Sequence, residues 1–443
     1  MRESLTQRLA PVIASAQATP EAVAALKLCL LDFLSCAFEA HTLPWSRQAA
    51  EVAARSHGPA SIVGGPHNVA VQAAAFANAV AGHGLVREDM HAGAVSHLGV
   101  VVLPAMLALS QQQRVSGREF AAACIVGYEV GARIGRALVT PAFMRQWRPT
   151  GFTGPLAAAA AGARLLQLSP PAVASALALA ANTVGGLNEW PRDGGEEMFF
   201  HPGFATRNAL MAVELAALGA YGSSGALDGA AGLFAAAGMV PAPDVRLFEG
   251  AAEIESVFRK ALPVCNFAQT PCQAALQIVQ AHALPATDIA RVTIRASAAA
   301  VEYPGCNGRG PFERVLQAKM SIPFCVASAL LDAAVTEACF ADLKRAPLLR
   351  LIALTTLEQD PVFSQAFPAR QGAEVVVELR DGVRHRARMD DLQAATAAMV
   401  AARFARAAHA VIGATRSEEL SAAVSALEKV DDIGALMRLS AQT

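Results

Sequence analysis

Ionisable residues are concentrated in one short stretch of the chain, Gly82–His97, which reads GHGLVREDMHAGAVSH. The stretch holds two acids, one arginine and three of the ten histidines. The segments on both sides are almost purely apolar, so these charges are expected at the edge of a buried region. Ionisable groups in apolar surroundings need partners or shifted pKa values, and acid–base catalysis is built from such groups. The competing interpretation is a solvated loop between two core helices.

The composition excludes several classes of protein. Hydrophobic residues make up 54% of the chain, charged residues 16%, and the net charge is −1, so no long-range attraction to nucleic acid or an anionic membrane is expected. The longest apolar run, 98–109, contains Pro104 and is shorter than the ~20 residues of a bilayer span. We expect a cytoplasmic protein that binds neither nucleic acid nor membrane, with its apolar helices buried in a large core or a subunit interface.

Motifs for nucleotides, metals and serine nucleophiles are missing from the sequence. It has no GxxxxGK[ST], no HExxH, no GxSxG and no GxGxxG after a predicted strand. The histidines of the stretch do not lie one helical turn apart, as two metal ligands on a helix would. The eight cysteines form no CxxC pair, and most lie in apolar segments as small hydrophobes. We therefore predict no metal and no cofactor, which leaves acid–base chemistry by side chains.

Helical patterns fill both ends of the chain, and a different pattern lies between them. Asp288–Ser297 alternates like a half-buried strand, and Glu374–Met389 contains two strands around an Asp-Gly turn, which predicts a hairpin. The segments 318–334 and 341–357 between them have helical patterns. The sequence thus predicts a mainly α protein. Its large all-α domain is built from residues 1–258 and 395–443, and a smaller α+β lid domain, 259–394, is inserted. A cleft between two such domains is the expected place for a small-molecule site.

Five segments in a fixed order resemble the MmgE/PrpD family. They are GHGLVREDMHAGAVSHLGVVVLPAMLAL, RPTGFTGPLAAAAAGARLLQLS, HPGFATRNALMA, KALPVCNFAQTP and QAKMSIPFCVASALLD. The family includes 2-methylcitrate dehydratase, cis-aconitate decarboxylase and iminodisuccinate epimerase. The resemblance implies the same two-domain fold, a homodimer, and an enzyme that removes a proton next to a carboxylate of a small di- or tricarboxylate.

The resemblance also implies a set of site residues. Those predicted to be catalytic are Asp89, His91, His97, Lys260 and Tyr303, and those predicted to bind substrate are Glu88, Arg148 and His201. The base is predicted to be Asp89 or His91, with His91 favoured if it is held neutral. Each residue also has a structural interpretation: His97 could be a satisfied core histidine, Lys260 a solvated lysine, and His201 a helix cap.

The chain departs from the family pattern at the site itself. Val86 stands where the family has an aspartate, Met90 where it has a threonine, Arg148 where it has a histidine and Met198 where it has a lysine. These departures indicate a divergent member with a different substrate. Three functions remain open: a cofactor-independent hydro-lyase, an epimerase, isomerase or decarboxylase on the same scaffold, and a binding protein without catalysis.

Overall fold

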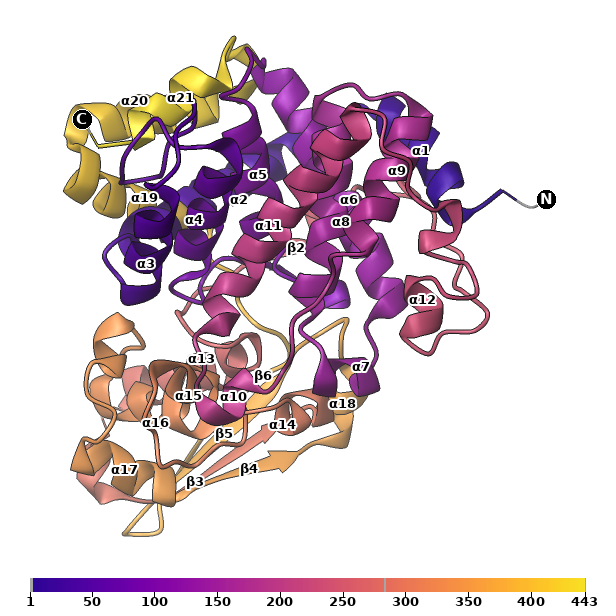
Figure 1. The fold of residues 1–443 in the computed structure, drawn as a ribbon. Coiled ribbons are helices and arrows are strands. Elements are labelled where there is room, and N and C mark those ends of the chain that lie inside the picture. Colours follow the sequence, from indigo (N-terminus) through magenta and orange to yellow (C-terminus); the bar gives the residue numbers. More distant parts are fainter. Residues whose placement is uncertain (1–2, 283, 443) are drawn as a thin grey trace.

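The computed structural model describes residues 3–282 and 284–442 and is mainly helical (Figure 1). The first part of the chain is a series of helices: α1 (Leu5–Ser15), α2 (Pro20–Ala40), α3 (Pro44–Ala53), α4 (Val71–His83), α5 (Gly99–Leu109), α6 (Gly117–Leu138), α7 (Pro141–Gln146), α8 (Pro149–Leu165), α9 (Pro170–Ala181), α10 (Trp190–Asp193), α11 (Glu197–Ala217) and α12 (Leu233–Ala236). Local signals set many of their ends. The Thr19 hydroxyl caps α2 ahead of Pro20, and Ser116 and Glu119 form a capping box at α6.

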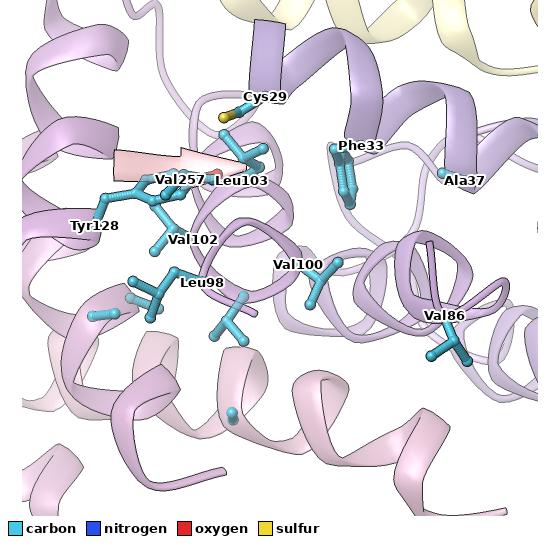
Figure 2. Packing of buried hydrophobic residues seen from close by; sticks show 14 of the residues in the cluster. Cys29, Phe33, Ala37, Val86, Leu98, Val100, Val102, Leu103, Tyr128 and Val257 are labelled. Atoms are coloured by element: carbon cyan, nitrogen blue, oxygen red, sulfur yellow. The ribbon is translucent and has the colours of Figure 1, made fainter. Parts of the chain in front are cut away.

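The core of this helical part is made largely of small side chains, which let the helices approach closely. Every residue of α5 is buried, so the apolar run at 98–109 is a core helix (Figure 2). Helices α6 and α8 pack against each other, and a Cβ at Gly131 would lie 2.8 Å from the Cβ of Ala157. A side chain at Gly131 would therefore push the helices apart. No helix of the described residues is long and apolar enough to cross a membrane.

A four-stranded sheet follows in the order β4-β3-β5-β6, at the bottom of Figure 1. Its strands are β3 (Ile289–Ala296), β4 (Thr355–Gln359), β5 (Ala373–Leu379) and β6 (Arg384–Met389). Strands β5 and β6 form the predicted antiparallel hairpin, and Gly382 in its turn has a φ of +86°, which favours glycine. The helices of this region are α13 (Gln269–His282), α14 (Ala298–Glu302), α15 (Val315–Met320), α16 (Ile322–Asp332), α17 (Ala346–Ala353) and α18 (Pro361–Ala366).

The chain then returns to the first group of helices. Helices α19 (Ala397–Ile412), α20 (Ala414–Ser425) and α21 (Ile433–Ser440) end the fold, and α19 packs along α2 (Figure 1). The Arg403 guanidinium of α19 donates to the backbone carbonyls of Lys260 and Ala261 at 3.0 and 2.5 Å. The last helices therefore fix the backbone at the point where the chain leaves the first helical part.

Candidate active site

The ionisable stretch joins α4 to α5 and is buried, so it is not a solvated loop. Its strand β1 (Asp89–His91) pairs antiparallel with β2 (Val257–Arg259), which places Lys260 beside the stretch although it is far away in the sequence. Val86 and Val95 have φ values of 59° and 48°. Branched side chains rarely adopt this left-handed conformation, and backbone strain of this kind is concentrated at functional sites.

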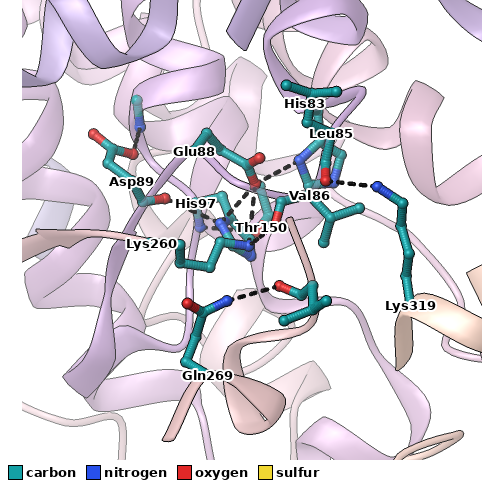
Figure 3. A network of polar contacts seen from close by, with 12 residues as sticks. His83, Leu85, Val86, Glu88, Asp89, His97, Thr150, Lys260, Gln269 and Lys319 are labelled. Atoms are coloured by element: carbon teal, nitrogen blue, oxygen red, sulfur yellow. Dashed lines mark hydrogen bonds and ion pairs between the residues drawn. The ribbon is translucent and has the colours of Figure 1, made fainter. Parts of the chain in front are cut away.

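Glu88 is the centre of a polar network (Figure 3). Its Oε1 lies 2.8 Å from His83 Nδ1, 2.9 Å from His97 Nδ1 and 3.9 Å from Lys260 Nζ. Burial alone would raise the pKa of this carboxyl, but the Lys260 ammonium and the two imidazoles hold it well below its usual range. Glu88 is therefore an anion that accepts a hydrogen bond from His83 and lies close to His97 Nδ1 and the Lys260 ammonium.

His97 is held by this network in one protonation state. Its Nδ1 donates to the Asp89 carbonyl at 3.0 Å and faces Glu88, so the proton of the neutral ring is on Nδ1 and the lone pair on Nε2. Burial lowers the pKa of His97 to about 4, which keeps the ring neutral at pH 7. In the part of the chain that the structure describes, Nε2 has no hydrogen-bond partner. A neutral imidazole with a free nitrogen is a competent general base.

Arg148 is a buried cation without a carboxylate partner among the described residues. It precedes α8, is 5% exposed, and donates from Nη2 to His83 Nε2 at 2.9 Å. His83 accepts this bond while its Nδ1 donates to Glu88, so His83 is also neutral, and burial lowers its pKa. The guanidinium lies over the Trp190 ring, with Cζ 5.2 Å from the centroid. Its other donors remain for a ligand, which would be an anion.

Two buried lysines hold the backbone of the stretch. Lys260 Nζ donates to the Val86 carbonyl at 2.5 Å, and Lys319 Nζ donates to the Leu85 carbonyl at 2.9 Å (Figure 3). Lys319 Nζ also donates to Glu337 Oε1 at 2.5 Å. Burial lowers the pKa of both ammonium groups. Both lysines therefore hold the backbone of the strained turn at Leu85 and Val86, where Val86 has a left-handed conformation.

A small cavity, with about 40 Å³ of free volume, lies in front of this network. It is lined by Val86, Met90, Val95, His97, Arg148, Pro149, Thr150, Trp190, Met198, Cys265, Asn266, Phe267, Tyr303 and Met320. The Tyr303 hydroxyl accepts from Asn188 Nδ2 at 3.1 Å, which leaves its proton free to donate, and burial raises its pKa to about 12. Larger hollows of about 470 to 630 Å³ exist elsewhere, but none is lined by a predicted site residue.

The structure brings His97, Arg148 and Tyr303 to this cavity, with Glu88 and Lys260 directly behind it. Asp89 and His91 do not line it. Both Asp89 oxygens accept hydrogen bonds, from Tyr128 at 2.5 Å and from the Gly99 amide at 3.2 Å, and a Cβ at Gly99 would collide with this carboxylate. In His91, Nε2 contacts Glu253 at 2.7 Å and Nδ1 accepts from the Ala94 amide, so neither nitrogen is free.

His201 lies on α11, three residues after Met198, and does not line the cavity. Its Nδ1 is buried without a hydrogen-bond partner among the described residues, and burial lowers its pKa to about 3. The acidic residues Asp193, Glu196 and Glu197 also lie outside the cavity lining. Among the residues with described positions, no three His, Cys, Asp or Glu side chains lie close enough together to hold a metal ion.

Sequence reasoning missed His83 and Asn188 as members of the site. His83 belongs to the ionisable stretch, so its type and position were a usable signal. Asn188 has no such signal, because its contact with Tyr303 depends on a residue 115 positions away.

The comparisons with known proteins define the class: the chain belongs to the MmgE/PrpD family. It matches the MmgE/PrpD N-terminal domain over residues 7–245 and the C-terminal domain over residues 262–429. This confirms the resemblance seen in the sequence.

Two curated relatives add a more specific likeness. The chain is 34% identical over 215 residues to the cis-aconitate decarboxylase-like protein oryM of Aspergillus oryzae, a match that covers 46% of this chain and 44% of that protein. It is 32% identical over 211 residues to a cis-aconitate decarboxylase of Aspergillus terreus, with 46% and 42% covered. The matched region thus spans less than half of the length of these relatives.

Proposed function

We propose that this protein is a cofactor-independent lyase of the hydro-lyase type, which removes a proton next to the carboxylate of a small hydroxy acid. One observation carries the proposal: Arg148, which has no carboxylate partner among the described residues, and His97, whose Nε2 has no hydrogen-bond partner among them, line the same cavity. A buried cation without a partner is costly unless a ligand supplies the anion. A neutral imidazole beside that anion is placed to take the acidic proton.

Each residue has one role in the proposed reaction. Arg148 binds the substrate carboxylate and stabilises the negative charge that develops on it when the α proton leaves. His97 Nε2 takes that proton, while Glu88 orients the ring and stabilises the imidazolium. Tyr303 donates its proton to the departing hydroxide, which leaves as water, and a carbon–carbon double bond remains. The tyrosinate regains a proton from His97 or from water at the end of the cycle.

We propose the family's domain division for this chain as well. Residues 1–258 and 395–443 form the helical domain, and 259–394 form the lid. This is supported by the packing of α19 on α2 and by the cavity lining, which takes Cys265, Phe267, Tyr303 and Met320 from the second region. A cytoplasmic homodimer is proposed with it on the family resemblance, and size-exclusion chromatography with light scattering tests the dimer.

Decarboxylation is the second candidate, favoured by the likeness to proteins named cis-aconitate decarboxylase. It would use the same cavity, with Arg148 on one carboxylate and a protonated group to quench the carbanion. Epimerisation would need a second acid–base group on the opposite face of the substrate, because the proton is removed from one face and returned to the other. His97 lies on one face only and cannot do both.

Proton NMR in D₂O with a panel of mono-, di- and tricarboxylates tests these candidates. Elimination gives a new vinyl signal, decarboxylation gives a product that lacks one carboxylate, and epimerisation gives deuterium exchange without net change. Loss of the exchange or product signal in Arg148→Gln ties the reaction to this cavity. If the wild-type protein changes no compound, the proposal of catalysis is wrong and a binding protein remains.

A further inference from the structure

Among the charged side chains that line the cavity or lie directly behind it, one positive charge is uncompensated. Arg148 and Lys260 are cations, Glu88 is an anion, and His83 and His97 are neutral in the hydrogen-bond pattern described above. Glu88 lies near Lys260 and the two histidines, whereas Arg148 has no carboxylate partner among the described residues. A single carboxylate from a ligand would neutralise the site.

The other nearby cations are not available to a ligand in this structure. Lys260 and Lys319 are fully buried, and their ammonium groups donate to the carbonyls of Val86 and Leu85. Neither lysine lines the cavity. Moving either one towards a ligand would leave a backbone carbonyl of the strained turn without its donor.

The rest of the cavity wall is mostly apolar. Met90, Met198 and Phe267 line it together with Val86, Met320 and Trp190. The buried Nε1 of Trp190 has no hydrogen-bond partner among the described residues, but it is a neutral donor and not a cation. A second carboxylate placed against these side chains would lose its hydration without gaining a cation, which is strongly unfavourable. A methyl or other apolar group in the same place would be favourable, because its burial removes apolar surface from water.

We infer that the substrate places one carboxylate on Arg148 and an apolar group against the Met90, Trp190, Met198 and Phe267 wall, so that it is a small monocarboxylate. This inference rests on the proposed function only for the role of Arg148 as the carboxylate-binding group. It narrows the substrate from the di- or tricarboxylate that the family resemblance implies.

Crotonate and fumarate test the inference as a matched pair. Both are four-carbon unsaturated acids, and crotonate has a methyl group where fumarate has its second carboxylate. Their dissociation constants are measured by ligand-observed NMR titration on the full chain at pH 7. We expect crotonate to bind at least about tenfold more tightly than fumarate, because the second carboxylate would be buried without a cation. Equal binding, or tighter binding of fumarate or cis-aconitate, overturns the inference.

Adding one cation to the wall should reverse the preference. Met198 is buried on the wall, and its Sδ lies 2.8 Å from His83 Nε2. Met198→Lys has a similar length and adds one charge, and Met198→Gln is the matched control without charge. We expect the lysine variant to strengthen fumarate binding relative to crotonate binding by at least about tenfold, measured as the ratio of the two dissociation constants. The glutamine variant should leave this ratio nearly unchanged. An equal shift in both variants contradicts the charge argument; if the lysine variant does not fold, the wild-type ratio decides alone.

The inference and the proposed function fail in different ways. If crotonate binds preferentially but no carboxylate undergoes exchange or elimination, the ligand class stands and the proposed catalysis is wrong. If 3-hydroxybutanoate is inert while malate, its partner with a second carboxylate, is turned over, the catalysis stands and the inference is wrong. If no carboxylate binds, or Arg148→Gln binds crotonate as well as the wild type, both are wrong.

Discussion

Two histidines of the same sixteen-residue stretch, His97 and His91, each contact a buried glutamate, and the two pairs differ in what surrounds them. In the first, Glu88 contacts His97 Nδ1, and His97 Nε2 is left without a protein partner beside the cavity. In the second, Glu253 contacts His91 Nε2 at 2.7 Å, and the other nitrogen of His91 caps a short turn. Glu253 also binds Arg133 at 2.8 Å and Arg136 at 3.0 Å.

The difference supports the proposal that the first pair is catalytic and the second structural. Burial and ion pairing are common to both, so neither property identifies the base. What distinguishes His97 is that, within residues 3–282 and 284–442, its Nε2 has no hydrogen-bond partner and the cavity beside it is also lined by Arg148, which has no carboxylate partner there. In the second pair, both nitrogens of His91 and the Glu253 carboxylate have protein partners. These contacts connect the stretch to α6 and to the turn before β2.

Replacing His97 should have the largest effect on activity. His97→Gln removes the proposed base but keeps a polar side chain that can still contact Glu88. A positioned base is typically worth about 10²- to 10⁴-fold in rate, so we expect kcat/KM for the substrate found by NMR to fall at least about 100-fold. Circular dichroism and the melting temperature check that the fold is kept. Near wild-type turnover in a folded variant would remove His97 from the mechanism.

Replacing Glu88 should have a smaller effect. Glu88→Gln removes the charge that stabilises the imidazolium, but the Asp89 carbonyl still accepts from Nδ1 and keeps the lone pair on Nε2. In a serine protease, where loss of the carboxylate allows the wrong tautomer, the cost is about 10⁴-fold. We expect a loss of kcat well below that figure, and below the loss in His97→Gln. A Glu88→Gln variant less active than His97→Gln would mean that Glu88 acts on the substrate directly.

Much of the fold and the location of the site could be predicted from the sequence. The Asp-Gly turn predicted the hairpin, the alternation of Asp288–Ser297 predicted β3, and the charged stretch between apolar helices predicted buried ionisable groups at the candidate site. Strand β4 was wrongly predicted as part of a helix, 341–357. Leu348, Leu351 and Ile352 do have helical spacing and form α17, but the chain then extends because Thr355–Gln359 pairs in parallel with β3, more than sixty residues earlier.

The choice between the histidines could not be predicted in the same way. All three have the same residue type and lie in one stretch, and what differs is the partner of each ring nitrogen. His91 is occupied because Glu253 lies against it, across 162 residues of chain. That contact depends on the β1–β2 pairing and on the arginines of α6, which no local pattern reveals.

The pH dependence of activity separates His97 from Asp89 as the base. The pKa of His97 is lowered by burial to about 4, and that of Asp89 is raised by burial to about 6. Either group must be unprotonated to accept a proton, so activity falls as pH drops below the pKa of the true base. We expect kcat/KM to be level from pH 8 to about 5 and to fall tenfold per unit below about 4. An acid limb near pH 6 would assign the role to Asp89. Because a substrate carboxylate also titrates near pH 4, the substrate's own pKa is measured by NMR as a control.

Replacing His91 should have the smallest effect on activity and a measurable effect on stability. In His91→Ala, Glu253 keeps Arg133 and Arg136 as counter-charges, so no buried charge is left alone. The variant loses a hydrogen bond to a charged group, which is worth about 1.5–3 kcal/mol, together with the cap on the Ala94 amide. We expect a lower melting temperature with kcat/KM close to that of the wild type. Glu253→Gln is the matched control, because it should also lower the melting temperature without loss of turnover. A loss of at least about 100-fold in a folded His91→Ala variant, with turnover kept in Glu253→Gln, would return the role of base to His91 and show that the free nitrogen of His97 does not mark the catalytic pair.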